Sequence, residues 1–599
     1  MNMIHYIDMD KDRKIIDNPK EAWEWFNEVE VKPYEMDSIE EQTLISTIVC
    51  YSEKYLTILV KSNQKNISFR DRSYQNGDGF HFVLAKPSKD NLPSKEFYVI
   101  GISPLDSTWK HKFIWYKNID LQMTYLKDTA ENVISNEGEH IICVQIPWYE
   151  IEPIQGFMLD EIGFNLCYVQ GLEKGKNIYM LKEDALIQSE QSPREYIVYD
   201  FQSPKIPKHP EYQVSFSKKH CEKDAFLSLD VAINSPCEHE YYVMLFNKKQ
   251  LIFKDKLYAS KGFNRERFEL KDLLLEIGKH TIDVEISIKE DCFKESRELY
   301  IYDERMFDQL SKDLSTLDDN HETNLINESN HALRFHYELL INMKNNLKNY
   351  ESFDGISSYY DDIVFKMEQV NLGRHLFIED KFIRLGHLSG IDNTYQPYTL
   401  YIPENLHDVK LFVYLHGSGS DDTSIMNAPF MKELAEKTSS VVLAPFARGT
   451  SHMYCTPESI KEIIELTEKI AELFSVSSDN IILCGFSMGG YGTYRLYDHS
   501  PESFSRLVVL SGHPSLGKQV NGPDYIETYD KFKDVPMLIF HGMGDRNCSY
   551  YEQVDFFENL SKINELCEVH IDEYRGHSGL TMEWYDQLLD WLMIDKGGI

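Results

Sequence analysis

The sequence lacks the features of a membrane-spanning, secreted or nucleic-acid-binding protein. Its 599 residues contain no run of about 18 uncharged apolar residues, the length that a membrane span requires. The first ten residues show no basic segment followed by an apolar run, so we expect no signal peptide. Positively charged residues are also fewer than negatively charged ones. The 62 Lys and Arg against 97 Asp and Glu leave a net charge of −35, which opposes binding to nucleic acid or to an anionic membrane.

The ten cysteines form no C-x-x-C pair. Cys50, Cys143 and Cys484 lie in apolar strand patterns. We therefore interpret the cysteines as reduced core residues rather than as a disulfide framework. Together these absences predict a cytoplasmic protein. We also predict no metal and no cofactor, and the sequence leaves the oligomeric state open.

What is present is the composition of a large globular protein. Hydrophobic residues make up 42% and aromatic residues 13% of the chain, with 37 Tyr and 32 Phe, which suits β-rich modules. A chain of this length exceeds a single core, so we predict a multidomain protein. Changes in pattern divide it into four segments, residues 1–203, 204–304, 305–376 and 377–599.

Residues 1–203 carry the pattern of a β-sandwich. Short apolar or alternating runs such as Leu44–Tyr51 and His140–Ile146 are separated by clusters of Asn, Gly, Asp and Pro. The stretch 77–84, the Ile146-Pro147-Trp148 motif and the stretch 163–166 resemble the family 9 carbohydrate-binding modules. This resemblance implies a sandwich with an aromatic-walled sugar site.

Two tryptophans are the candidates for that wall. Trp109 and Trp115 lie in one short stretch, and flat aromatic rings stack on sugar faces. The alternative is that both are core or strand-edge aromatics, and that the module is a structural relic.

Pro204, Pro207 and Pro210 mark a stiff linker. After it, residues 211–304 alternate again, which predicts a second, immunoglobulin-like β-sandwich without chemistry of its own.

From residue 305 to 376 the spacing of apolar residues becomes helical, and we predict a helical connector. His321, His331 and His336 fall in this segment, and we interpret them as lying on solvated helix faces rather than as metal ligands.

Residues 481–496 carry the strongest functional signal. Four apolar residues from Ile481 to Cys484 predict a buried strand, G-x-S-x-G follows with Ser487 at its centre, and helical spacing continues beyond it. A serine at such a strand-to-helix turn sits in a cramped backbone conformation that requires small neighbours. It also lies at a helix N-terminus, where free N–H groups favour an oxyanion. Ser487 is therefore predicted to be a nucleophile.

The rest of residues 377–599 alternates strands and helices, with eight predicted strands and the serine after the fifth. Thr456 and Pro457 predict the N-cap and first turn of one helix. This pattern resembles the α/β-hydrolase fold across the whole segment.

A serine needs a base and an orienting carboxylate to act as a nucleophile. In α/β-hydrolases these follow in the order Ser, acid, His, each after a strand. The H-G-x-x-D stretch that ends in Asp545 resembles the acid loop of that fold, and His577 follows the last predicted strand. The resemblance implies that Asp545 is the acid and His577 the base.

Other residues compete for these roles. The rival acids are Asp530, Asp534 and Asp555, and His513 is the rival base. Because His513 follows the strand before the acid, we expect it to line the substrate pocket instead.

An oxyanion hole needs two backbone N–H donors. Met488, directly after the nucleophile, is predicted to supply one. The other is expected from His416-Gly417-Ser418-Gly419, which resembles the H-G-x-G loop of the fold. Either Gly417 or Ser418 can supply that N–H, and we favour Ser418.

The substrate class rests on likeness to other proteins. Residues 389–403 introduce the fold as in carbohydrate esterases related to feruloyl and acetylxylan esterases, with counterparts in prolyl-oligopeptidase-like hydrolases. Between Ser511 and Pro536 there is no room for a large lid. The first interpretation is a serine esterase that deacylates a small-molecule or oligosaccharide ester. The alternatives are a serine peptidase of the prolyl oligopeptidase type and a binding protein with an inactive hydrolase domain.

Overall fold

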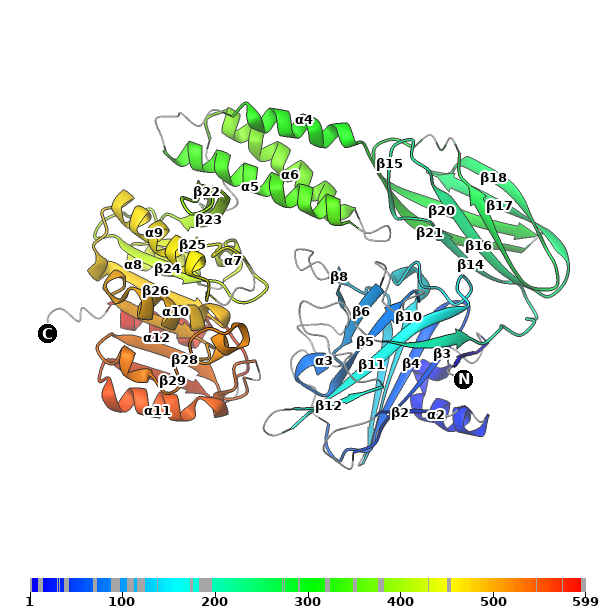
Figure 1. The fold of residues 1–599 in the computed structure, drawn as a ribbon, viewed down its shortest axis with the longest axis horizontal. Coiled ribbons are helices and arrows are strands. Elements are labelled where there is room, and N and C mark those ends of the chain that lie inside the picture. Colours follow the sequence, from blue (N-terminus) through cyan, green and yellow to red (C-terminus); the bar gives the residue numbers. More distant parts are fainter. Residues whose placement is uncertain are drawn as a thin grey trace. The chain divides into compact units, whose positions relative to one another are not determined.

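The computed structural model divides the chain into two compact units, coloured along the sequence in Figure 1. Unit 1 consists of Met1–Phe307 and Asn342–Ser358, and unit 2 of Asp308–Ile341 and Tyr359–Ile599. The predicted division of the chain into four segments is finer than these two units, and it stays a prediction. The structure describes residues 3–593 except for 9–13, 30, 32, 37–42, 68–72, 88–96, 105–112, 116–123, 137, 173–175, 182–195, 272, 274, 289–290, 318–323, 348–352, 375–381, 429, 450–453, 546 and 574.

The described residues of the first part of unit 1 form thirteen strands. Their order is β8-β7-β6-β5-β11-β13-β1-β3-β4-β10-β9, with β12 beside β11 and β2 beside β3. Strand β1 pairs in parallel with both β13 and β3, so it joins two groups of antiparallel strands. The strands are β1 Met3–Tyr6, β2 Tyr34–Met36, β3 Ile45–Tyr51, β4 Tyr55–Ser62, β5 Gly79–Ala85, β6 Phe97–Ile102, β7 Phe113–Trp115, β8 Thr124–Tyr125, β9 Ala130–Asn136, β10 Glu139–Pro147, β11 Glu161–Gly171, β12 Lys176–Met180 and β13 Ile197–Phe201.

Apolar side chains from both groups of strands form one buried cluster. Ile58 of β4 and Val144 of β10 belong to it together with Phe82 of β5 and Phe164 of β11. Helix α2, Pro19–Glu28, lies against a second cluster that includes Trp23. Helix α3, Ser73–Asn76, and the 3-10 turn η1, Trp148–Glu150, complete this part.

The second part of unit 1 contains two smaller sheets that share a core. One has the order β14-β16-β19 and the other β15-β21-β20-β17-β18. Val231 of the first and Val284 of the second lie in the same buried cluster. The strands are β14 Glu211–Phe216, β15 His220–Glu222, β16 Ser228–Ser235, β17 His239–Asn247, β18 Gln250–Ala259, β19 Gly262–Glu269, β20 Gly278–Ile288 and β21 Asp291–Tyr302.

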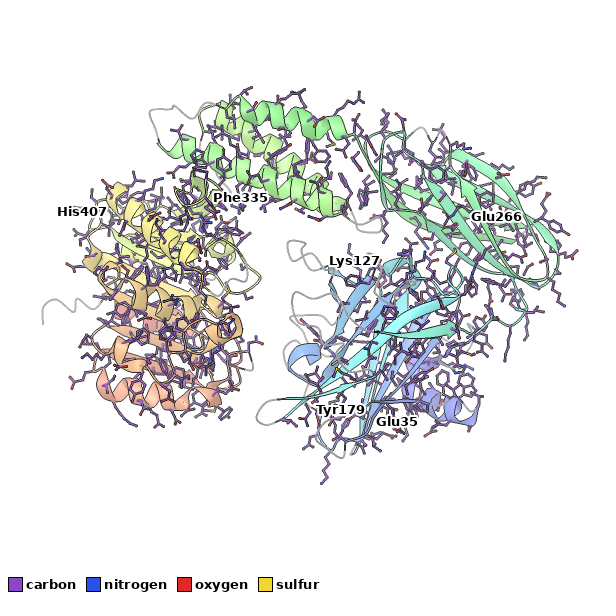
Figure 2. All side chains as sticks on the ribbon, viewed as in Figure 1. Glu35, Lys127, Tyr179, Glu266, Phe335 and His407 are labelled. Carbon is purple, nitrogen blue, oxygen red and sulfur yellow. The ribbon has the colours of Figure 1, made fainter. Side chains whose placement is uncertain are left out.

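Three helices follow, α4 Glu304–Ser315, α5 Asn324–Asn346 and α6 Asp354–Asn371. Helix α5 packs directly on the first strand of unit 2, because a Cβ added to Gly386 would lie 2.6 Å from the amide nitrogen of Ala332. The ring of Phe335, labelled in Figure 2, lies 5.3 Å from that of Phe446.

One expectation for α5 is wrong. His336 is 1% exposed rather than solvated, and its ring lies edge-on to Tyr359 of α6 at 5.8 Å. Burial lowers the pKa of His336, so the neutral imidazole is the stable form. The apolar spacing of α5 gives its helical period but does not reveal that α6 covers a second face.

Unit 2 contains an eight-stranded sheet in the order β22-β23-β25-β24-β26-β27-β28-β29. Strands β24 to β29 pair in parallel, while β22 and β23 are antiparallel. This is the α/β-hydrolase fold in the C-terminal third of the chain. The strands are β22 Phe382–Leu388, β23 Tyr395–Tyr401, β24 Lys410–Leu415, β25 Ser440–Pro445, β26 Ile481–Phe486, β27 Arg506–Leu510, β28 Met537–Gly542 and β29 Cys567–Asp572.

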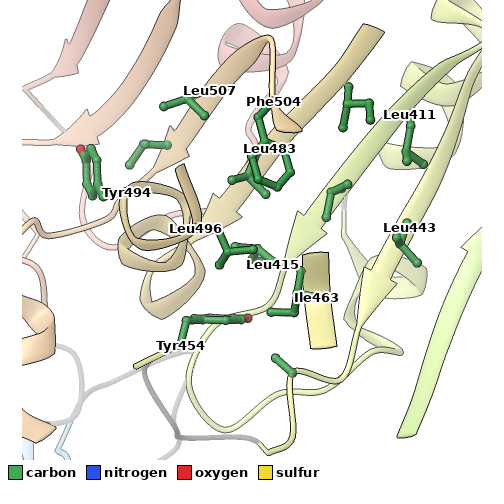
Figure 3. Close-up of a cluster of buried hydrophobic side chains, with 14 of the residues drawn as sticks. Leu411, Leu415, Leu443, Tyr454, Ile463, Leu483, Tyr494, Leu496, Phe504 and Leu507 are labelled. Carbon is green, nitrogen blue, oxygen red and sulfur yellow. The ribbon is translucent and has the colours of Figure 1, made fainter. Parts of the chain in front are cut away.

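Alternate residues of these strands enter two cores, one on each face of the sheet. Leu411 and Val413 of β24 lie in one core, and Phe412 and Tyr414 in the other. Figure 3 shows the first, where Ile463 packs near the strand leucines. Its helices are α9 Pro457–Leu473, α10 Met488–His499 and α11 Val554–Ile563. The opposite core is covered by α7 Ser424–Asn427, α8 Met431–Thr438 and α12 Met582–Met593.

The predicted start of α9 is confirmed, since the Thr456 side chain accepts a hydrogen bond from the Ser459 amide and Pro457 is the first helical residue. Within the described part of the chain, no helix combines the length and apolarity needed to cross a bilayer.

Candidate active site

Ser487 lies at the turn between β26 and α10. Its φ of 55° and ψ of −113° fall outside the regions that L-residues ordinarily adopt, so the turn is strained. The Ser487 amide donates to the carbonyl of Leu510 at 2.9 Å, and the Tyr491 amide donates back to the Ser487 carbonyl at 3.2 Å. Packing of β26, β27 and α10 therefore maintains the strained conformation.

Two glycines make this turn possible. A Cβ on Gly485 would lie 2.0 Å from the carbonyl oxygen of Gly489, and a Cβ on Gly489 would lie 2.1 Å from that of Leu415. Real Cβ atoms do not approach so closely. The G-x-S-x-G pattern is thus explained by backbone contacts among β24, β26 and α10.

The structure brings Ser487, His577 and Asp545 into one hydrogen-bonded chain. Oγ of Ser487 lies 2.8 Å from Nε2 of His577, and Nδ1 of the same ring lies 2.8 Å from Oδ2 of Asp545. A carboxylate beside Nδ1 holds the ring proton on that nitrogen, which leaves Nε2 as an acceptor for the serine hydroxyl. The arrangement can remove a proton from Ser487.

Asp545 is 1% exposed and firmly oriented. Its Oδ1 accepts the backbone N–H groups of Asn547 at 2.9 Å and Cys548 at 2.8 Å, which leaves Oδ2 directed at His577. His541, the last residue but one of β28, lies with Nε2 3.7 Å from Oδ2 of Asp545. Burial lowers the pKa of His541, so a neutral ring packs beside the carboxylate.

The two loops that carry Asp545 and His577 touch each other. The Gly544 amide donates to the carbonyl of Arg575 at 2.8 Å, and a Cβ on Gly542 would lie 2.5 Å from that oxygen. The loop after β29 therefore rests on the backbone of the loop after β28.

Ser511 is a site residue that sequence reasoning missed. Its hydroxyl donates to the carbonyl of Ser578 at 2.8 Å and accepts the Ser578 amide at 3.3 Å, one residue after His577. Ser511 is fully buried. The available signal was its position directly after β27, at the sheet edge where the other site residues follow β26, β28 and β29.

The predicted oxyanion donors lie in two segments near Ser487. Met488 is the first residue of α10, and the first N–H groups of a helix have no partner inside the helix. Gly417 follows β24, and its position packs against Phe486, since an added Cβ would lie 3.1 Å from that ring. The choice between the amides of Gly417 and Ser418 stays a prediction.

The loop after β24 has an anchor that the sequence did not suggest. Arg384 of β22 binds Asp422 with two hydrogen bonds of 2.7 Å, and the Thr399 hydroxyl adds a third of 2.9 Å. Arg384 and Asp422 are both buried. This pair fixes the far end of the segment that begins at His416.

His513 is 8% exposed and lies between Ser515 and Glu552. Its Nδ1 accepts the Ser515 amide at 3.1 Å, and Nε2 is 3.6 Å from the exposed carboxylate of Glu552. Burial lowers the pKa of His513, so the neutral ring carries its proton on Nε2. The role of His513 in binding substrate stays a prediction.

The other candidates do not join the chain of hydrogen bonds. The rival acids Asp530, Asp534 and Asp555 are exposed. Trp109 lies outside the described residues, and Trp115 ends β7 with a side chain that is not described. Among the side chains that the structure describes, no three His, Cys, Asp or Glu residues form a group able to hold a metal ion.

Residues 518–594 match the prolyl oligopeptidase family. This stretch includes Asp545 and His577. The chain is also 26% identical over 216 residues to protein phosphatase methylesterase 1 of Kluyveromyces lactis, which covers 33% of this chain and 51% of that protein. The chain thus spans about half the length of this curated relative.

Solved structures similar to this chain include serine hydrolases and esterases. Fluorophosphonate-binding serine hydrolase F of Staphylococcus aureus is 21% identical, with a TM-score of 0.30 over 35% of this chain and 97% of its own. An acetyl xylan esterase of Aspergillus awamori is 14% identical, with a TM-score of 0.29 over 35% and 98%. The family match and the hydrogen-bonded Ser487, His577 and Asp545 together indicate a serine hydrolase.

Proposed function

We propose that the protein is a serine carboxylic ester hydrolase that works through an acyl-enzyme. The observation that carries this proposal is the chain of two 2.8 Å hydrogen bonds from Ser487 through His577 to Asp545. Its nucleophile lies on a strained turn at the N-terminus of a helix. In this reaction Ser487 is the nucleophile, His577 the general base and Asp545 the orienting acid.

In the first half of the reaction, Oγ of Ser487 attacks the ester carbonyl carbon while its proton passes to Nε2 of His577. The carbonyl oxygen becomes an oxyanion, which accepts hydrogen bonds from the amide of Met488 and from that of Ser418 or Gly417. Loss of one such donor raises the barrier by about 3 to 4 kcal/mol. When the intermediate collapses, the bond to the alcohol oxygen breaks and His577 returns the proton to that oxygen.

In the second half, water replaces the alcohol. His577 takes a proton from the water as the water oxygen attacks the acyl carbon. When this intermediate collapses, the bond to Oγ of Ser487 breaks, His577 returns the proton to Oγ, and the carboxylic acid leaves. Asp545 stabilises the imidazolium formed in each half without itself accepting the proton.

We infer that the substrate is an acylated carbohydrate of the acetyl or feruloyl type. Support comes from the resemblance of residues 389–403 to carbohydrate esterases. The segment between Ser511 and Pro536 also adds only the short 3-10 turns η4, Leu516–Val520, and η5, Tyr529–Phe532. Without a long lid of its own, the hydrolase domain suits a bulky alcohol. His513, whose Nε2–H makes no hydrogen bond among the described residues, suits a polar group of this substrate.

A serine peptidase of the prolyl oligopeptidase type is the second candidate, favoured by the match of residues 518–594 to that family. Both reactions use the same nucleophile and base. They differ in the leaving group, which is an alcohol in one and an amine in the other.

A substrate panel separates these functions. We expect turnover of p-nitrophenyl acetate and methyl ferulate and none of a proline aminoanilide, whereas the reverse result would establish the peptidase. Ser487→Ala should abolish turnover and leave thermal unfolding nearly unchanged. The matched control is Ser478→Ala, at an exposed serine shortly before β26, which should behave as wild type. If well-folded protein turns over none of the three substrates, an inactive hydrolase domain with a binding role is the better account.

For the rest of the chain, we propose that residues 1–203 and 204–304 form two β-sandwiches, the first resembling family 9 carbohydrate-binding modules. We also propose a cytoplasmic location, supported by ten cysteines that are all free thiols.

A further inference from the structure

Unit 1 contains a cavity of about 330 Å³. Its wall is formed on one side by the ends of β4 and β10 with the turn η1, and on the other by β14 and β21. The volume is at the small end of the range for small-molecule sites, about 300 to 1,000 Å³. The cavity therefore suits a ligand of one or two rings.

Aromatic rings form a large part of the wall. They are Tyr55, Trp148, Tyr149, Tyr212 and Phe293. Phe293 is half-buried and stacks on Tyr212, with ring centroids 5.0 Å apart and planes 27° apart. Tyr149 is 36% exposed, and the Arg297 guanidinium lies 5.6 Å from its ring centroid. Neighbouring side chains thus hold the rings of Phe293 and Tyr149 in place, as a stacking platform requires.

The charged groups of the wall balance. Three acids, Glu53, Asp128 and Glu295, face three bases, Lys54, Lys294 and Arg297. Because opposite charges cancel at this range, the cavity favours neither a strongly anionic nor a cationic ligand. The guanidinium of Arg297 is already bound, to Glu152 at 3.0 Å and to Glu295 at 2.6 Å.

One acceptor in the wall is unused. Gln155 is 1% exposed, and its Nε2 donates to Glu152 at 3.2 Å and to the Val214 carbonyl at 3.4 Å. Its Oε1 is buried without a partner among the described residues. Leaving such an acceptor unpaired is costly, so the site is completed by a ligand that brings a hydroxyl or N–H donor.

We propose that this cavity binds a neutral saccharide of one or two rings, at a place separate from Ser487. A pyranose has apolar ring faces for Phe293 and Tyr149, and hydroxyls for Gln155 and the carboxylates. An apolar ligand would leave these polar groups unpaired. The site differs from the sugar wall predicted at Trp109 and Trp115.

Binding is tested on the full-length Ser487→Ala variant by saturation-transfer difference NMR. The probes are methyl β-glucoside, methyl β-galactoside, methyl β-xyloside, cellobiose and xylobiose, with galacturonate and phenyl phosphate as anionic controls. At about 10 mM probe, a site with a millimolar Kd is mostly occupied, so we expect signals from at least one neutral probe and weaker ones from the anions. No signal from any neutral probe, or stronger binding of the anions, would overturn the proposal.

Phe293→Ala and Tyr149→Ala should each weaken binding by about fivefold, because each removes a stacking surface. Tyr258→Ala, at an exposed tyrosine of β18 in the same unit, is the matched control and should bind as wild type. Folded Phe293 and Tyr149 variants with unchanged affinity would refute the site.

Hydrogen–deuterium exchange on the same Ser487→Ala protein locates the bound ligand without any substitution in the cavity wall. A bound glycoside should protect residues 53–55, 147–149, 212–214 and 293–297, and protection confined to other segments would exclude this cavity. Because all these experiments measure binding without turnover, their failure would leave the esterase proposal intact, and inactivity toward esters would leave this one intact.

Discussion

At the scale of single residues, Ser487 shows how much of a site is set by backbone strain. Its φ of 55° and ψ of −113° are unfavourable for a residue with a side chain, yet they point the hydroxyl at His577. Packing of the surrounding strands and helix offsets the free-energy cost of this backbone conformation. The same position between β26 and α10 places Ser487 beside the free N–H groups of a helix start.

Asp545→Asn tests the orienting acid. The Asn side chain keeps an oxygen for the amides of Asn547 and Cys548, but its NH₂ group faces Nδ1 of His577. The ring then adopts the tautomer whose Nε2 is protonated and cannot accept the serine proton, so kcat should fall by about 10⁴-fold. Steady-state ester hydrolysis measures this. Asp555→Asn, at an exposed rival position, should retain activity, and equal losses in both variants would contradict the assignment of Asp545.

Ser511→Ala tests a positioning residue. The change removes both hydrogen bonds to Ser578, so the segment carrying His577 loses its anchor. Small misplacements of reacting groups cost up to about 100-fold, so we expect kcat to fall by about tenfold or more with KM little changed. Ser515→Ala, whose hydroxyl binds Asp524 instead, is the control. A rise in KM alone would show that Ser511 acts on substrate binding.

At the scale of elements, the site depends on how closely α10 approaches β24. An added Cβ at Gly489 would lie 2.1 Å from the Leu415 carbonyl, whereas one at Gly390 would meet no atom within 4 Å. Gly489→Ala must therefore push the helix from the strand. Overpacking of this kind costs about 1 to 3 kcal/mol or more, and it also shifts Met488 and Ser487.

We expect Gly489→Ala to lower the free energy of unfolding by about 1 to 3 kcal/mol or more and to abolish ester hydrolysis. Gly390→Ala should keep the stability and the activity of the wild type. Denaturant titration and activity assays measure both. A Gly489→Ala protein of normal stability and activity would show that the turn adjusts without cost.

The elements themselves were largely predictable. The eight strands of unit 2 and the start of α9 follow from local patterns, since alternating apolar residues, N-cap Thr456 and Pro457 act within a few residues of the chain. The burial of His336 was not predictable. It depends on α6, which packs on α5 through contacts that no local period encodes.

At the scale of the whole molecule, the pH dependence of stability has a contribution from Glu53. Burial raises its pKa to about 7 from the ordinary 4.5, with the nearby Glu211 and Glu295 adding to the shift and Lys54 opposing it. The folded state thus binds a proton that the unfolded state releases. This contribution to stability is fully present below about pH 4.5 and is lost as the pH rises through about 7.

Glu53→Gln removes this titration. The variant should exceed wild type in stability by up to about 3 kcal/mol at pH 8 and by little at pH 4.5, because a shift of one pKa unit corresponds to about 1.4 kcal/mol. Denaturant unfolding without ligand at both pH values measures it. Glu266→Gln, on the exposed face of β19 and labelled in Figure 2, should retain the wild-type slope. Parallel pH profiles for wild type and Glu53→Gln would contradict the role of Glu53.

The sequence by itself determined the parts of this protein whose causes are local. These include the strand-turn-helix at Ser487, its flanking glycines and the strand ends before Asp545 and His577, because they depend on residues within a few positions of one another. Only the tertiary structure decided which of four candidate carboxylates lies beside His577. It also decided that Ser511 and the Arg384–Asp422 pair hold the loops, and that a polar aromatic cavity exists in unit 1. Those features depend on distances between segments far apart in the chain, which are set by how the sheets pack.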